Sequence, residues 1–303
     1  MSTMSYKNVI IIGAGGNLGP PVLKAFLSSS FNTSVLSREG SNSTFPSGVN
    51  VIHANYDDPE SLKKAFQGQD AVVSLVGGAA LGDQEKLIDA SIAAGVKRFF
   101  PSEFGSDTPN PRTRELVPLF SAKTGAVAYL KSKESAISWT SVITGPFFDW
   151  GLKVGFLGFN LQDKTFTVVD SGDATFSTTN VLYIGKALVA ALVKADQTKN
   201  QYVYVSEFQI SQNELLKLAE KVTGEEFTVK KTTFKEHVAL GNKLLSEGNH
   251  AGLGPLIQSI TFGDERLGDL SKNGLWNERL GLEVDSIEDS IKTGFAGKLL
   301  HEA

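Results

Sequence analysis

The feature that most restricts the fold of this chain is a run of β-branched residues followed directly by glycines and two prolines, NVIIIGAGGNLGPPVLKAF at residues 8–26. A short apolar run bounded by glycine is typical of a strand buried on both faces of a parallel sheet. Pro20 and Pro21 lack an N–H donor, which costs little in the first turn of a helix because amides there have no intrahelical partner. The stretch therefore predicts a buried strand, a tight glycine turn and a helix.

The first half of the chain continues to alternate between strand and helix patterns. Further strands are expected at 33–38, 49–56, 70–78, 96–105 and 139–145. Helices are expected at 58–68, at 83–95 and from about Pro118. Strands separated by helical patterns of this length predict right-handed βαβ units. The predicted fold class is α/β: a Rossmann-type, doubly wound parallel sheet with a smaller C-terminal α+β lobe.

Beyond residue 150 the patterns are more mixed. Residues 164–180 suggest a hairpin-like connection, and 200–211 suggest one strand. Residues 211–224 predict a helix with a capping box at Ser211 and Glu214 and with Gly224 past its end. Residues 234–264 have the composition of helices and loops that close over a ligand. We expect a dinucleotide-binding domain at 1–150, to which 176–205 return, and a substrate-binding lobe at 151–175 and 206–303.

The glycines after the first strand have the spacing Gly13-x-x-Gly16-x-x-Gly19. The commoner G-x-G-x-x-G pattern does not fit, because Leu18 stands where its third glycine belongs. At the first strand of a βαβ series such a turn predicts a dinucleotide site, in which the amides of Asn17, Leu18 and Gly19 face a pyrophosphate. The alternative is a strand-to-helix turn without a ligand.

The end of the second predicted strand indicates which dinucleotide is bound. NAD-binding sheets place an Asp or Glu here, whereas this chain has Ser37 followed by Arg38. A guanidinium pairs with a 2′-phosphate through charge-assisted hydrogen bonds, and an acid would repel it. The pair therefore favours NADP(H), the alternative being a solvated arginine in a turn.

Composition excludes several classes of function. The net charge of −4 gives no electrostatic footprint for nucleic acid or an anionic membrane. There is no cysteine, and the four histidines form no i, i+4 pair, so no metal site is expected. The leader MSTMSYKN is too short and too weakly basic for a signal peptide, and no run of 18 apolar residues exists. We expect a cytoplasmic protein that does not enter the membrane.

Four features together resemble the NmrA-like family of atypical short-chain dehydrogenases/reductases, and within it the isoflavone reductase-like branch of fungal type. They are the glycine turn, the segment LIDASIAAGVKRFFPSEFGSD at 87–107, Lys123, and WTSVITGPFFDWGL at 139–152. The likeness covers nearly the whole chain, is most specific at PSEFG, and is weakest after about residue 205. It implies an NADPH-dependent reductase of aromatic or secondary-metabolite substrates with a carbonyl or enone group.

The resemblance also implies a catalytic residue. The family lysine that lies early in the helix after the fifth strand matches Lys123, which would stabilise an oxyanion or deliver a proton and would also contact the cofactor. A second candidate is Tyr129 with Lys133, which has the Tyr-x-x-x-Lys spacing of short-chain dehydrogenases. Ten helical residues separate Lys133 from Lys123 by roughly 80° and about 15 Å, so both cannot serve one hydride. We rank Lys123 first and expect Tyr129 and Lys133 on an outer helix face.

Other residues are expected around the cofactor and substrate. Two glycines end the fourth strand where a side chain would obstruct the cofactor, and Ser102 and Phe104 follow the fifth strand. In the family, the loop after the sixth strand touches the nicotinamide, and the segment NYDD at 55–58 resembles the one beside the adenine. Its aspartates are alternatively helix caps, and the aromatic residues alternatively pack the lobes together. The cofactor-contacting set adds Gly77, Gly78, Ser102, Pro146 and Phe147, and the substrate-contacting set is Phe104, Phe148 and Trp150.

Two departures from the family limit what can be carried over. The loop EGSNSTFPSG at 39–48 lacks the second basic residue of several plant relatives, and Gly145 replaces their asparagine. A second function also stays open, because NmrA-like proteins include non-catalytic NAD(P) sensors that act through a protein partner. For the reductase we expect a small-molecule substrate and a monomer or homodimer.

Overall fold

The computed structural model describes residues 6–302. The chain forms two compact units, each built from separate stretches of sequence. The first takes in the described residues up to Glu103 with Ser121–Val142 and Gly185–Val203. The second takes in Phe104–Phe120, Ile143–Ile184 and the described residues from Tyr204 onward. The predicted division into a cofactor domain (1–150 with 176–205) and a substrate lobe stays a prediction. In the compact units, residues 104–120 and 143–150 belong to the second unit.

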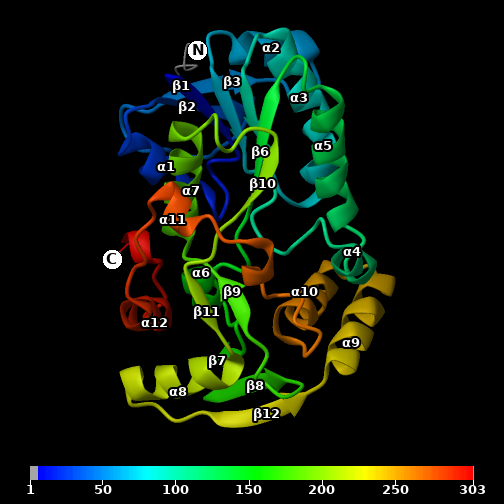
Figure 1. The fold of residues 1–303 in the computed structure, drawn as a ribbon, viewed down its shortest axis with the longest axis vertical. Coiled ribbons are helices and arrows are strands. Elements are labelled where there is room, and N and C mark those ends of the chain that lie inside the picture. Colours follow the sequence, from blue (N-terminus) through cyan, green and yellow to red (C-terminus); the bar gives the residue numbers. More distant parts are fainter. Residues whose placement is uncertain (1–5, 303) are drawn as a thin grey trace. The chain divides into compact units, whose positions relative to one another are not determined.

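A seven-stranded sheet forms the centre of the first unit, in the order β10-β6-β5-β4-β1-β2-β3 (Figure 1). The strands are β1 (Asn8–Ile12), β2 (Asn32–Arg38), β3 (Asn50–Ala54), β4 (Ala71–Ser74), β5 (Arg98–Phe100), β6 (Ser138–Ile143) and β10 (Gln201–Tyr204). Neighbouring strands from β6 to β3 are parallel. The chain runs outward from β1 to β3 and returns at β4 on the other side of β1. Ligands bind parallel sheets outside the carboxyl ends of the strands at such a reversal point.

Helices cover both faces of this sheet, α2, α3 and α5 on one side and α1 and α7 on the other (Figure 1). They are α1 (Gly19–Leu27), α2 (Pro59–Phe66), α3 (Gln84–Ala93), α5 (Phe120–Ser132) and α7 (Val181–Val193). Ile10 and Ile12 share a buried cluster with α2, α3 and α5. The alternate residues Val9 and Ile11 are equally buried, at 0% exposure. The predicted doubly wound α/β fold is confirmed.

The segment before α5 differs from expectation. One helix was expected from about Pro118, whereas a separate short helix α4 (Pro111–Leu116) precedes α5. Asn110 caps α4 by accepting the Arg112 amide at 3.0 Å, and Pro111 takes the first helical position. The sequence NPR at 110–112 is thus an N-terminal helix signal that the prediction did not use.

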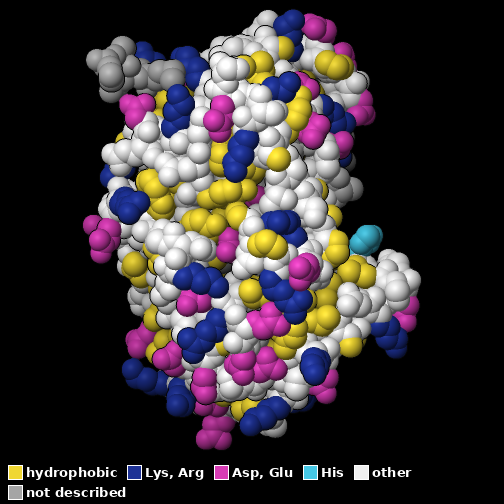
Figure 2. All heavy atoms as spheres, turned by 45° about the vertical axis from the view of Figure 1, so that its right-hand side comes forward, with side chains coloured by type: hydrophobic (Ala, Val, Ile, Leu, Met, Phe, Trp, Pro, Cys, Tyr) yellow, Lys and Arg dark blue, Asp and Glu magenta, His cyan; other side chains and the backbone are white. Residues whose placement is uncertain are grey.

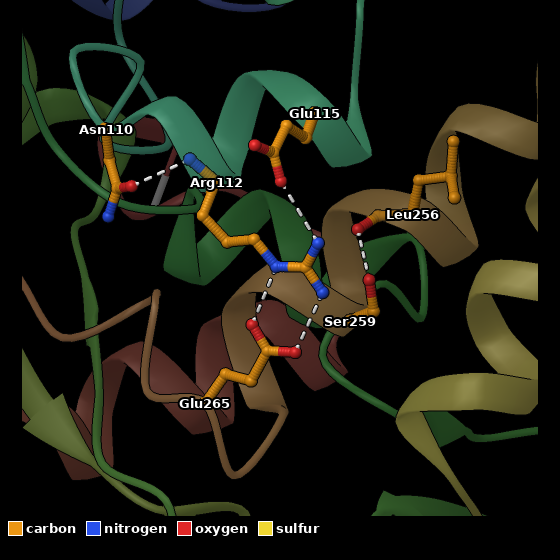
Figure 3. A network of polar contacts seen from close by, with 6 residues as sticks. All are labelled: Asn110, Arg112, Glu115, Leu256, Ser259 and Glu265. Atoms are coloured by element: carbon orange, nitrogen blue, oxygen red, sulfur yellow. Dashed lines mark hydrogen bonds and ion pairs between the residues drawn. The ribbon is translucent and has the colours of Figure 1, made fainter.

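Figure 3 shows how α4 is joined to the chain after α10 (Leu253–Phe262) within the second unit. The Arg112 guanidinium donates to both carboxylate oxygens of Glu265 at 3.0 Å and to Glu115 at 3.2 Å. The same two segments also share an apolar cluster of Leu116, Val117, Phe120, Leu256, Ile260 and Leu267. These contacts explain why residues 104–120 pack with the second unit.

The second unit contains two small sheets. One has the order β12-β8-β7, and the other pairs β11 with β9. Their strands are β7 (Phe159–Asn160), β8 (Thr165–Val169), β9 (Phe176–Thr178), β11 (Phe208–Ile210) and β12 (Thr228–Thr232). The helices are α6 (Phe148–Lys153), α8 (Gln212–Thr223), α9 (Phe234–Ser246), α10, α11 (Asn277–Leu280) and α12 (Ile287–Phe295). Phe159, Phe166, Phe227 and Phe295 pack in its core.

Two strand predictions for this part were wrong. Residues 164–180 form no hairpin, because β8 pairs with β7 and β12 whereas β9 pairs with β11. Residues 200–211 form two strands in different sheets, β10 and β11. The helix prediction was right: α8 has the Ser211–Glu214 capping box and ends at Gly224 in the left-handed conformation.

The protein surface carries mixed charge on the face drawn in Figure 2, where Lys and Arg side chains alternate with Asp and Glu. No large patch of one sign is visible on that face. Among residues 6–302 there is no helix with the length and apolar character needed to cross a membrane.

Candidate active site

The turn between β1 and α1 is closed by two backbone hydrogen bonds. The Gly16 amide donates to the Gly13 carbonyl and the Gly19 amide to the Gly16 carbonyl, each at 3.0 Å. Gly13 has φ +81°, and a Cβ there would lie 2.9 Å from the Leu75 carbonyl oxygen. A Cβ on Gly19 would lie 2.1 Å from the carbonyl oxygen of Ala14. The turn therefore needs glycine at both ends of its spacing.

The expectation that three successive amides face a ligand was wrong for Gly19, whose amide is used inside the turn. Leu18 is the N-cap residue of α1 and has a buried side chain. The backbone that faces open space is the earlier part of the turn, from Gly13 to Gly16, which lines a cavity.

This cavity has a volume of about 600 Å³ and lies at the carboxyl ends of β1, β2, β3 and β4. It brings together five residues of the predicted cofactor set: Gly13, Gly16, Ser37, Arg38 and Gly77. Its described lining does not include Asn17, Leu18, Gly19, Gly78, Ser102 or Lys123. Tyr56 and Asp57, from the NYDD segment that resembles the one beside the adenine, also line it. Lining residues that the prediction did not name are Ser41, Ser43, Phe45, Ala80, Asp83 and Lys86.

Arg38 ends β2 with an exposed side chain, and Ser37 before it is buried. Both stand beside β3, where Ser37 is in register with His53 and Arg38 with Ala54. The Tyr56 hydroxyl donates to the Leu36 carbonyl at 3.3 Å. Burial raises the pKa of Tyr56 to about 12, and the positive charge of Arg38 opposes that rise. The guanidinium therefore lies close enough to Tyr56 to affect the pKa of its hydroxyl group.

The loop after β2 approaches the glycine turn. A Cβ on Gly15 would lie 2.6 Å from Oγ of Ser43, so the loop leaves no room for a side chain there. The Ser41 hydroxyl donates to the Ser43 hydroxyl at 3.1 Å. The loop thus gives the cavity small hydroxyl groups and Phe45.

The NYDD segment serves two roles. Asp58 caps α2, with its carboxylate accepting the Glu60 amide at 3.0 Å. Asp57 lines the cavity and pairs with Lys86 of α3 at 3.0 Å. The sequence signal for Lys86 was only an i, i+3 spacing after Asp83, which is common on helix surfaces.

Lys123 lies in the first turn of α5, and its side chain is half-buried. Its ammonium donates to the Glu103 carbonyl just after β5. Burial lowers the pKa of Lys123 below its ordinary value of 10.5, and the nearby Glu103 carboxylate opposes this. A lowered pKa makes an ammonium a better proton donor near neutral pH.

Ser102 connects Lys123 to the cavity. The Ser102 hydroxyl donates at 2.6 Å to the carbonyl of Val76, a cavity residue, and its amide donates at 2.7 Å to Oε1 of Gln84. The next residue, Glu103, accepts the Lys123 ammonium. The lysine is thus held after the end of β5, by the residue that follows Ser102.

Tyr129 lies near the end of α5, and Lys133 directly follows that helix. The Tyr129 hydroxyl donates to Asp89 of α3 at 2.6 Å, and this bond raises the pKa of Tyr129 to about 12. The Lys133 ammonium lies 5.0 Å from the centre of the Tyr129 ring. Neither residue lines the cavity, and Tyr129 packs in part against the core of the first unit.

The second unit carries the other predicted residues. Gly145 has φ +68°, and a Cβ there would lie 2.1 Å from the Ser177 carbonyl oxygen, so a plant-like asparagine does not fit this backbone. The Pro146 carbonyl accepts the Thr179 amide at 3.1 Å, and the Phe147 and Trp150 rings meet edge to face at 6.3 Å. Phe104 is buried, with φ +40°.

Phe148, which was predicted to contact the substrate, lies in the protein interior. It is 0% exposed and packs on Phe208, with 5.0 Å between ring centres. It therefore belongs to the core of the second unit and offers no face to a ligand. Trp150 of the substrate-contacting set is partly exposed, and so is Phe147, which was assigned to the cofactor.

Comparisons with known proteins confirm the family that the sequence resembles. A model of the NmrA-like family matches residues 5–248. The oxidoreductase aprR of Aspergillus flavus is 35% identical over 294 residues, covering 95% of this chain and 99% of that protein. The isoflavone reductase homolog P3 of Arabidopsis thaliana is 33% identical over 262 residues, covering 79% and 81% of the two chains.

Solved structures share the fold at lower identity. A crystal structure of isoflavone reductase superposes with a TM-score of 0.77 at 20% identity, covering 94% of this chain and 98% of the other. A binary complex of leucoanthocyanidin reductase with NADPH from Vitis vinifera gives a TM-score of 0.74 at 21% identity, covering 95% and 99%.

Proposed function

Because the chain belongs to the NmrA-like family, we propose that it is a cytoplasmic, NADPH-dependent reductase of a small aromatic or secondary-metabolite substrate. The bond reduced is a carbonyl or an enone. The observation that carries the proposal is the cavity at the reversal point of the sheet, which has a glycine turn on one side and Arg38 at its rim. Relatives named oxidoreductases, and an NADPH complex of the same fold, support it.

The cavity fits the cofactor by size and by chemistry. Its volume of about 600 Å³ lies within the range of ligand pockets. The backbone from Gly13 to Gly16 would hold the pyrophosphate, because no Cβ of those glycines keeps an anion away. Ser37 and Arg38 would hold the adenosine 2′-phosphate, and Gly77 would leave room for the ribose. When bound there, NADPH supplies the hydride.

Lys123 carries the proposed acid chemistry. Its ammonium is held at the end of β5 by the Glu103 carbonyl, and burial has already weakened its hold on a proton. It would deliver that proton to the substrate oxygen on which negative charge develops. Phe147 and Trp150 would offer apolar surface to a planar substrate.

The test is NADPH consumption followed at 340 nm with a panel of quinones, aryl aldehydes and enones, together with a fluorescence titration of NADPH. Tight NADPH binding and turnover of at least one class are expected. Tight binding without turnover of any class would favour the alternative of a non-catalytic sensor. Absence of NADPH binding would refute the proposed reductase.

A further inference from the structure

A second cation shares the cavity with Arg38. Lys86, in the first turn of α3, lines the cavity and pairs with Asp57 at 3.0 Å and with Asp83 at 3.3 Å. The Lys86 side chain is 37% exposed, whereas those of Asp57 and Asp83 are 87% and 56% exposed. The ammonium is thus held in place by carboxylates that are themselves largely in water.

Lys86 reaches the cavity on the side where Arg38 stands. Arg38 is in register with Ala54 on β3, and Asp57 follows three residues after Ala54. Tyr56, the neighbour of Asp57, lies within the electrostatic reach of Arg38. The loop at 39–48 contains no lysine or arginine, so Lys86 is the basic residue that lines the cavity besides Arg38 in the described chain.

We propose that Lys86 is the second cation that binds the 2′-phosphate of NADPH, supplied by α3 rather than by the loop after β2. The inference rests on the proposed function, since it names a further specificity residue of the same site. An ammonium has three N–H donors, and the two carboxylates engage at most two of them, which leaves one for a phosphate oxygen.

The charges in the cavity support a second cation at the 2′-phosphate. Arg38 and Lys86 are balanced by Asp57 and Asp83, so these four side chains have no net charge. A phosphate monoester carries a charge of about −1.5 to −2 at neutral pH. Because exposed ion pairs are weak, Lys86 can turn from a carboxylate to the phosphate at little cost. The negative charge of each aspartate, in contrast, repels the phosphate.

The decisive experiment uses two variants with opposite expected signs. Lys86→Gln should weaken binding of NADPH and of 2′,5′-ADP about tenfold, while NADH and 5′-AMP change less than about twofold. Asp57→Asn removes a repelling charge and releases Lys86, so it should strengthen NADPH and 2′,5′-ADP about two- to fivefold. If the ion pair served only to join α3 to the loop after β3, both variants would weaken binding.

Lys63→Gln is the matched control, because Lys63 forms an exposed i, i+3 pair with Glu60 on α2 and does not line the cavity. Wild-type protein that does not bind NADPH would refute the proposed function. Wild-type protein that prefers NADPH, combined with a Lys86→Gln variant whose NADPH and NADH affinities fall equally or not at all, would overturn this inference alone. Asp57→Asn gives an independent answer if Lys86→Gln does not fold.

Discussion

Arg38 is the residue on which the choice of cofactor depends in this account. It is exposed at the carboxyl end of β2 and lines the cavity. A guanidinium–phosphate pair contributes about 1.5 to 3 kcal/mol, or roughly ten- to a hundredfold in affinity. Arg38→Ala should therefore weaken NADPH by that factor and NADH only slightly, as measured by fluorescence titration. Equal weakening of both cofactors would refute the assignment.

The buried carboxyl group of Glu207 should make the stability of the second unit depend on pH. Its carboxylate is 5% exposed and accepts the amides of Asn180 at 3.0 Å and Asp285 at 3.1 Å. Burial, with a contribution from the charge of Asp285, raises the pKa of Glu207 to about 7 from its ordinary 4.5. The folded state then binds more protons than the unfolded state between these two values. Stability should accordingly be greatest at the acidic end of this window and fall as pH rises toward 7.

Urea denaturation at pH 5, 6, 7 and 8 measures this effect. Wild-type protein should lose roughly 1 to 3 kcal/mol of unfolding free energy between pH 5 and 8. Glu207→Gln, which cannot ionise, should have a flatter profile over the same range. An unchanged slope in the variant would show that another group is responsible.

At the scale of elements, the junction of β1 and α1 is the least tolerant part of the first unit. A methyl group on Gly19 would overlap the Ala14 carbonyl, so Gly19→Ala should cost about 1 to 3 kcal/mol and weaken NADPH binding. Gly125→Ala in α5 is the control, because a Cβ there meets nothing within 4 Å. It should stabilise the protein by about 0.5 to 1 kcal/mol. Thermal denaturation of both variants tests the pair.

The sequence correctly predicted those elements that are determined by residues close together in the chain. The glycine turn, the two prolines of α1 and the Ser211–Glu214 capping box all depend on residues within a few positions of each other. The strands of the second unit depend on partners far away, as β8 pairs with β12 about sixty residues later. Residues 164–180 therefore resembled a hairpin although their two strands belong to different sheets.

At the scale of the molecule, the candidate cavity is assembled from four separate segments at the end of the parallel sheet. The sequence predicted the contributions that come from strand ends, such as Gly13, Arg38 and Gly77. It did not assign Lys86, because the place of this lysine depends on the fold bringing α3 beside the segment after β3, where Asp57 lies. Phe148 was misjudged for the same reason, since its burial depends on Phe208.

Binding of the cofactor should stabilise the whole protein by mass action. At a concentration of 100 times its Kd, NADPH should add about 2.7 kcal/mol, which raises the thermal transition by roughly 4 °C for a chain of this length. NADH at the same concentration should give a smaller shift, because it lacks the 2′-phosphate. Equal shifts in a thermal scan would contradict the proposed NADPH preference.

The central claim is that Lys123 is the proton donor of an NADPH-dependent reductase, and turnover of Lys123→Met beside Tyr129→Phe tests it most directly. Methionine keeps much of the lysine stem but removes the ammonium, so folding and NADPH affinity should be retained while turnover falls about 10²- to 10⁴-fold. Tyr129→Phe should remain close to wild type, because its hydroxyl is held by Asp89 outside the cavity. An inactive tyrosine variant beside an active lysine variant would contradict the account and assign the chemistry to the Tyr129–Lys133 pair.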